Sequence, residues 1–171
     1  MIKKTPEQTA LEKEKVKSLY HAIGQFVFEF SQLEFTIRHL LGEILEFKDT
    51  GPDALFDILI SPYDFATLCN VTKAVFMRVV RCEQSDRDEI ESIMNAALSL
   101  NSEDRLPIAH GTWFIGNEGH GARHVSRGKL EMKIRYPKVA DIDAAAQKAA
   151  TLRVRVVKFI CGTIPPLPEV D

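Results

Sequence analysis

Two residues of this sequence carry side chains suited to acid–base chemistry on a phosphodiester. Arg105 and His110 lie five positions apart in the segment Arg105-Leu106-Pro107-Ile108-Ala109-His110-Gly111. Cleavage of RNA without a metal ion needs a group that moves the proton of the 2′-hydroxyl or the leaving oxygen, and a cation that stabilises the phosphorane. Imidazole titrates near neutral pH, and guanidinium offers a charged planar fork to phosphate oxygens. The pair predicts acid–base catalysis by His110 and phosphate binding by Arg105.

The spacing of the pair constrains how the two side chains can meet. Residues five apart on a regular helix point about 140° apart around its axis. Two arrangements would bring them together: a kink at Pro107 that turns His110 inward, or a twofold axis that places Arg105 and His110 of two chains in one cleft. The second arrangement predicts a homodimer.

The same pair also has a structural interpretation. In it, Arg105 forms an ion pair with Asp104, Glu103 or Glu34, and His110 caps the C-terminal end of its helix. Asp104 and Glu34 are also the acids that we expect to support an active site.

Glu34 needs a partner in either interpretation. Helical projection places it within the apolar stripe of the first expected helix, where a carboxylate must be compensated. It either pairs with Arg38 four residues later or orients Arg105 or His110.

Charge is distributed unevenly along the chain. Acidic residues gather between 83 and 104, and basic residues gather between 120 and 138. These are either two solvated faces, or the basic segment contacts RNA phosphates. The candidate substrate-binding residues are Arg123, His124, Arg127, Lys133 and Arg135.

The hydrophobic pattern predicts helices before and after this basic segment. A long first helix starts at Pro6, with Thr5 as its cap, and has an apolar stripe at helical spacing. Ser61 and Ser85 mark the starts of two further helices, and residues 142–160 form the last one. The first stripe consists of Leu19, Ile23, Phe26, Val27, Phe30, Leu33, Ile37, Leu40, Leu41, Ile44 and Leu45.

The first helix carries a second partly apolar face, which consists of Phe28, Gln32, Phe35 and His39. A simple surface helix has one apolar face. We expect the second face to contact another copy of the chain, or else the C-terminal helix or the hairpin described next.

Residues 112–136 predict a β-hairpin. Thr112–Ile115 is β-prone, 116–128 is a glycine-rich loop, and 130–136 alternates apolar and polar residues. Trp113 is expected to anchor the hairpin on the helices. A proline-rich tail covers about 164–171.

Composition indicates one globular domain spanning 1–171, and the order of the predicted elements favours the mainly α class, an antiparallel helical bundle with a small inserted hairpin. The chain has 171 residues, 45% of them hydrophobic and 27% charged, and a net charge of −2. Three separated cysteines, expected in the core, indicate a reduced cytoplasmic protein, and no apolar run is long enough to cross a membrane. His120 and His124 lack further ligands, so no metal or cofactor is expected.

The Arg-x4-His-Gly segment followed by Trp113, together with Ser31-Gln32-Leu33-Glu34 in a long first helix, resembles the HEPN (higher eukaryote and prokaryote nucleotide-binding) superfamily. The resemblance implies a helical homodimer and a metal-independent ribonuclease of toxin or defence type, with Arg105 and His110 as its catalytic pair and a cognate antitoxin as a possible partner. Active members commonly carry a polar residue such as Asn where this chain has Leu106. The alternative is therefore a non-catalytic dimeric module that binds a nucleotide, nucleic acid or protein.

Overall fold

The computed structural model describes residues 6–45, 55–116, 119–125, 132–136 and 138–163. It confirms the mainly α class with a small antiparallel β element. The helices are α1 (Pro6–Ile44), α2 (Leu55–Ile60), α3 (Phe65–Val79), α4 (Gln84–Leu100), α5 (Leu106–His110) and α6 (Val139–Thr163). A π-helical turn, Asn101–Arg105, joins α4 to α5, and the strands are β1 (Thr112–Gly116), β2 (Gly119–Val125) and β3 (Met132–Arg135). Thr5 and the tail 164–171 lie outside the described residues.

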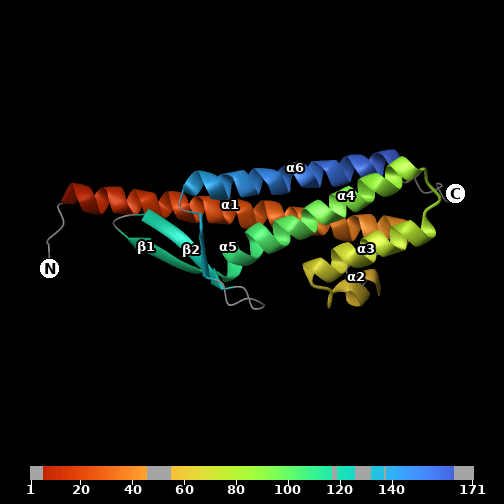
Figure 1. The fold of residues 1–171 in the computed structure, drawn as a ribbon, viewed down its shortest axis with the longest axis horizontal. Helices are drawn as coiled ribbons and strands as arrows, with labels where there is room; N and C mark the ends of the chain where they lie inside the picture. Colours follow the sequence, from red (N-terminus) through yellow and green to blue (C-terminus); the bar gives the residue numbers. More distant parts are fainter. Residues whose placement is uncertain (1–5, 46–54, 117–118, 126–131, 137, 164–171) are drawn as a thin grey trace.

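The long helices lie side by side (Figure 1). α1 and α6 run in the same direction along most of their lengths, and α4 runs back against them toward the sheet. α3 packs against α1 and α4 at the opposite end from the sheet. The site segment, which includes α5, therefore lies where the helical bundle meets the sheet.

The apolar stripe of α1 forms the centre of the core. Eight of its predicted residues are buried, and so is Ala22, which the prediction omitted; the eight are Leu19, Phe26, Phe30, Leu33, Ile37, Leu40, Leu41 and Ile44. The prediction was wrong for Val27 and Leu45, which are 47% and 39% exposed. Both lie about a quarter turn from the line of Leu33 and Ile37, beyond the reach of the packed helices.

Two helix starts differ from the predicted ones. α3 begins after Asp64, whose carboxylate accepts the Thr67 N–H at 2.7 Å, whereas Ser61 donates to the Ile58 carbonyl and ends α2. α4 begins at Gln84, one residue before Ser85, with Glu83 in the cap position. In each case an acidic residue takes the position that the sequence pattern assigned to serine.

The predicted hairpin is a three-stranded antiparallel sheet in the order β1-β2-β3. The segment expected to be a glycine-rich loop contains β2, so that prediction was wrong for residues 119–125. Trp113 and Phe114 pair with Ala122 and Gly121. Small residues opposite aromatic ones leave room for the rings, which offsets the poor strand propensity of glycine.

The three cysteines differ in environment. Cys69 is buried, and burial raises the pKa of its thiol to about 12. Cys82 is partly buried, but Cys161 is exposed, so the expectation of a core position was wrong for Cys161.

A bidentate ion pair joins α4 to α6. Arg155 donates to both carboxylate oxygens of Glu89, at 2.6 and 2.7 Å, and also to Ser92. The hydrogen bonds from Arg155 hold the pKa of Glu89 below its ordinary value.

We expect this pair to stabilise the fold above the pKa of an unfolded glutamate and to be lost as pH falls through the lower folded value. Because both side chains are more than a third exposed, Glu89→Gln should cost less than about 1 kcal/mol at pH 7 and less still at pH 3. Urea unfolding at both pH values measures this. Glu91→Gln, which removes one contact of 3.5 Å to Lys73, is the control and should have a smaller effect. An equal loss for Glu89→Gln at both pH values would contradict the assignment.

Candidate functional site

Arg105 and His110 of one chain lie side by side. Arg105 ends the π turn and His110 ends α5, and Arg105 Nη1 is 3.5 Å from His110 Nε2. Guanidinium nitrogens only donate hydrogen bonds, so this contact requires an unprotonated Nε2 and a proton on Nδ1. Arg105 is half-buried and His110 is exposed. The contact forms within one chain, without the twofold axis that the spacing suggested.

Arg105 rests against the body of the bundle. Its guanidinium carbon is 5.8 Å from the centre of the Phe30 ring, which in turn packs 4.5 Å from Phe65 at the start of α3. The pKa of the neighbouring Asp64 is lowered mainly by the Thr67 N–H and further by the positive charge of Arg105. The pair therefore sits where α1, α3 and α5 converge.

Pro107 explains the π turn that ends at Arg105. Proline has no N–H, and its ring crowds the carbonyl four residues earlier, which here belongs to Glu103. The helix accommodates this with an i to i+5 hydrogen bond from the Leu106 N–H to the Asn101 carbonyl. The Glu103 carbonyl instead accepts hydrogen bonds from Arg135 and from the Tyr136 hydroxyl, the latter at 3.2 Å.

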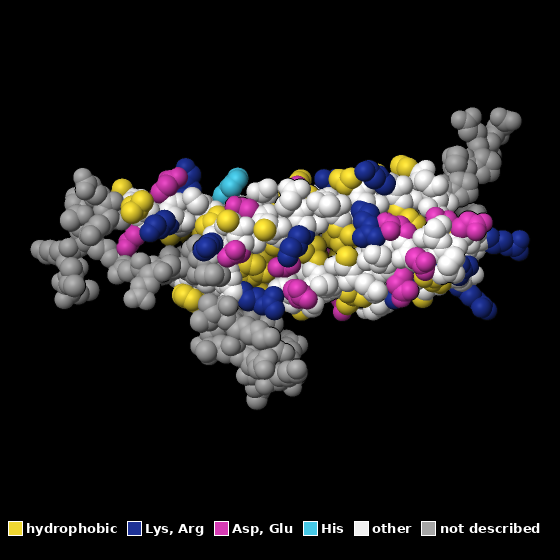
Figure 2. Space-filling model, turned by 45° about the horizontal axis from the view of Figure 1, so that its top comes forward, with side chains coloured by type: hydrophobic (Ala, Val, Ile, Leu, Met, Phe, Trp, Pro, Cys, Tyr) yellow, Lys and Arg dark blue, Asp and Glu magenta, His cyan; other side chains and the backbone are white. Residues whose placement is uncertain are grey.

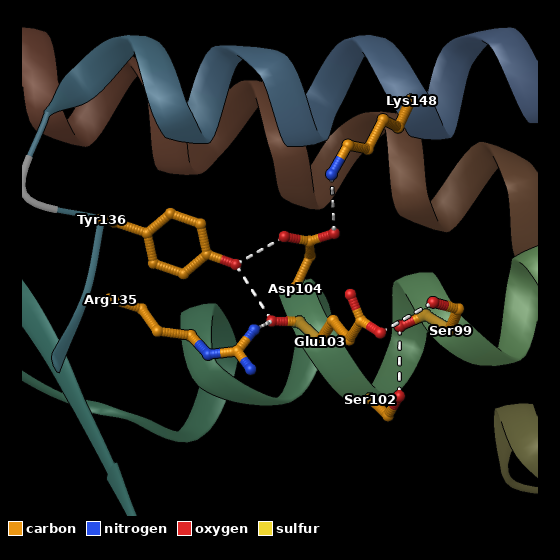
Figure 3. Close-up of polar contacts among 7 residues, drawn as sticks. All are labelled: Ser99, Ser102, Glu103, Asp104, Arg135, Tyr136 and Lys148. Atoms are coloured by element: carbon orange, nitrogen blue, oxygen red, sulfur yellow. Dashed lines mark hydrogen bonds and ion pairs between the residues drawn. The ribbon is translucent and has the colours of Figure 1, made fainter. Parts of the chain in front are cut away.

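Asp104 lies in a polar network with α6 and the end of the sheet (Figure 3). The Tyr136 hydroxyl donates to its carboxylate at 2.7 Å, and Lys148 Nζ lies 3.7 Å away. Burial and this hydrogen bond raise the pKa of Tyr136. Although Asp104 is adjacent to Arg105 in sequence, its carboxylate is bound to Tyr136 and Lys148 and not to Arg105, unlike the expected ion pair.

Glu34 has the simpler of its two expected partners. Arg38 donates to its carboxylate at 2.8 Å and also to the carbonyls of Ile60 and Tyr63. The i, i+4 pair is confirmed, and it ties α1 to the segment between α2 and α3. The carboxylate of Glu34 is thus engaged by Arg38 rather than by the Arg105–His110 pair.

The candidate RNA-binding residues are distributed over the sheet. Arg123 and His124 lie in β2, Lys133 lies opposite His124 in β3, and Arg127 lies outside the described residues. Arg135 ends β3 and donates to the Glu103 carbonyl. Arg135 therefore has a structural partner that the sequence pattern did not indicate.

Trp113 anchors the sheet on the helices, as predicted. Its Nε1 donates to the Ile108 carbonyl at 3.0 Å, and its ring stacks with Tyr136 at 6.3 Å. Gly111 allows α5 to lead directly into the sheet. A Cβ at this position would lie 2.2 Å from the Pro107 carbonyl oxygen and 3.2 Å from the Ala122 Cβ of β2.

The second face of α1 is exposed to solvent. Phe28 and Phe35 are 60% and 67% exposed, and Tyr20 and Val27 extend the apolar surface. The alternative in which α6 or the sheet buries Phe28 and Phe35 is therefore wrong. The prediction had omitted Tyr20, although its spacing of seven and eight residues to Val27 and Phe28 places it on the same face.

A groove of about 650 Å³ between α4 and α6 was not predicted. Figure 2 shows hydrophobic side chains along its floor and charged ones beside it. It is lined by Ala96, Ser99, Leu100, Glu103, Asp104, Ala144, Gln147, Lys148, Thr151, Leu152 and Arg155. The groove lies between two helices that are distant in sequence, so no local sequence pattern predicts it.

Comparison with protein family models, with curated proteins and with solved structures finds no match to this chain. Within the described ranges, no three His, Cys, Asp or Glu side chains come together in a way that could hold a metal ion. No helix formed by those residues has the length and apolar character needed to span a bilayer.

We expect Gly111→Ala to destabilise the site segment by about 1–3 kcal/mol, because the new methyl group would overlap the Pro107 carbonyl. Gly24→Ala is the matched control, since a Cβ at that helical position meets no atom within 4 Å. It should stabilise α1 by about 0.5–1 kcal/mol. Urea unfolding of both variants tests this, and equal effects would show that Gly111 is not sterically required.

Proposed function

We propose that this protein is a metal-independent endoribonuclease of the toxin or defence type, similar to HEPN ribonucleases and located in the cytoplasm. The observation that supports this is the 3.5 Å contact between Arg105 Nη1 and His110 Nε2. The contact joins a permanent cation to an imidazole nitrogen whose lone pair accepts a hydrogen bond from it. These are the two groups that metal-free cleavage of RNA requires.

The chemistry begins with the 2′-hydroxyl of the RNA. His110 Nε2 accepts the proton of that hydroxyl while the 2′-oxygen attacks the adjacent phosphorus. Arg105 turns its fork to the phosphate oxygens and stabilises the charge of the phosphorane. The bond from phosphorus to the 5′-oxygen then breaks, and the proton held by the imidazole passes to the leaving oxygen. The products are a 2′,3′-cyclic phosphate and a 5′-hydroxyl.

The proposal includes a homodimer formed through the second face of α1. Tyr20, Val27, Phe28 and Phe35 are each 47–67% exposed along one side of this helix. Several exposed apolar side chains on one helix face favour association, because burial removes them from water. A cognate antitoxin protein is an alternative occupant of the same face.

Cleavage of an end-labelled RNA in EDTA tests the enzymatic proposal. We expect the parent protein to leave cyclic phosphate ends, and His110→Ala and Arg105→Ala each to lose at least about 100-fold in rate. His21→Ala removes another exposed histidine, in α1, and should cleave like the parent.

Two outcomes would contradict the proposal. Equal cleavage by the parent and both site variants would reassign the activity to another site or to a contaminant. An absence of cleavage by folded parent protein on several RNAs would favour the binding module, which Leu106 already suggests. Binding that falls steeply with salt would then identify a nucleic acid as the ligand, whereas weak salt dependence would indicate an apolar protein surface.

The dimer has a separate test. Phe28→Glu combined with Phe35→Glu should convert a dimer to a monomer in analytical ultracentrifugation, because two charges would have to be buried at the interface. Leu59→Glu places one charge on an exposed apolar position of α2 and should leave the dimer intact. A parent protein that sediments as a monomer would refute the dimer while leaving the catalytic pair untouched.

A further inference from the structure

Two backbone carbonyls near Arg105 and His110, those of Glu103 and Ile108, lack the N–H donor that an α-helix supplies four residues later. The Glu103 carbonyl has lost its donor four residues later, because that residue is Pro107. The Ile108 carbonyl lies near the end of α5, where Gly111 leaves the helix in an extended conformation. The Glu103 carbonyl lies two residues before Arg105, and the Ile108 carbonyl lies two residues before His110.

Side chains from the sheet satisfy both carbonyls. Arg135 and the Tyr136 hydroxyl approach the Glu103 carbonyl, and Trp113 Nε1 donates to the Ile108 carbonyl at 3.0 Å. The Tyr136 hydroxyl has a single proton, and its shorter bond, at 2.7 Å, goes to the carboxylate of Asp104. Arg135 is therefore the main donor to Glu103, and Tyr136 links that carbonyl to Asp104 (Figure 3).

Tyr136 holds a costly backbone conformation to make these contacts. Its φ is 60°, the one positive value among the non-glycine residues that the structure describes. This left-handed region costs a residue with a Cβ on the order of 1–2 kcal/mol. The ring is buried and stacks with Trp113, so the surrounding contacts hold the conformation in place.

We propose that Arg135, Tyr136 and Trp113 form a carbonyl clamp that holds the π turn and thereby sets the position of the Arg105–His110 pair on the bundle. A π turn contains one more residue than an α turn, so its loss would rotate the following segment by about 100°. Such a rotation would carry Arg105 away from the Phe30 ring. Arg135 and Tyr136 are thus positioning residues that act through the backbone of Glu103. This inference rests in part on the proposed function, because the pair is taken as the catalytic one.

Steady-state cleavage by two variants of Arg135 tests the clamp. Arg135→Ala should lower kcat by about tenfold or more and leave KM for RNA within about twofold, because the pair is displaced while the RNA surface stays intact. Arg135→Lys keeps one charged donor for the Glu103 carbonyl and should restore most of kcat. A rise in KM with kcat unchanged would overturn the proposal, since it would make Arg135 a contact to the RNA phosphates.

A second measurement is independent of ribonuclease activity. Nitrogen-15 NMR of the imidazole rings should show His110 in the Nδ1–H form in the parent, with its signal assigned from the His110→Ala spectrum. In Arg135→Ala and Tyr136→Phe it should shift to the pattern of the exposed His21, and Tyr20→Phe should change nothing. An unchanged His110 signal in folded variants would overturn the clamp. If the parent cleaves no RNA, the proposed function fails while this measurement still decides the clamp.

Discussion

One backbone carbonyl, that of Glu103, connects the sheet to the segment that carries Arg105 and His110. Pro107 deprives Glu103 of its helical hydrogen bond, so this carbonyl can accept from donors outside the helix. The chain satisfies it from the sheet, with Arg135 and Tyr136 at the end of β3. The same constraint accounts for the π turn, for the seating of the sheet on the helices and for the unusual backbone of Tyr136. A proline that would ordinarily kink or end a helix is here accommodated by a π turn.

The π turn also separates two adjacent charges. Asp104 faces α6 and the sheet, where Tyr136 and Lys148 compensate its buried carboxylate. Arg105 faces Phe30 and His110 on the other side. Because the acid is held by other partners, the guanidinium remains available to an anion. A guanidinium that contacts an imidazole, while the nearby Asp64 carboxylate accepts the Thr67 N–H, is suited to binding a phosphate.

The long helix α1 connects this end of the molecule to the rest. One side of α1 packs against α3 and α6 and buries the main hydrophobic stripe. Its other side exposes Tyr20, Phe28 and Phe35. Phe30, on the packed side, supports Arg105 directly. A partner bound to the exposed face would therefore lie on the same helix that supports the candidate site.

The sequence alone determined the four longer helices, because their signals are local: apolar residues at helical spacing, a proline in the first turn of α1 and an i, i+4 pair between Glu34 and Arg38. The short α2 was not predicted. It also singled out Arg105 and His110 by residue type. Their contact, the partner of Asp104 and the role of Arg135 depended on the tertiary structure, since each involves residues brought together by the π turn or by the sheet. β2 was missed for the same reason, as its small residues Gly121 and Ala122 form a strand only through pairing with Phe114 and Trp113 on a neighbouring strand. Hydrogen-bond partners distant in sequence leave no periodic trace, so no pattern of single residues could have predicted them.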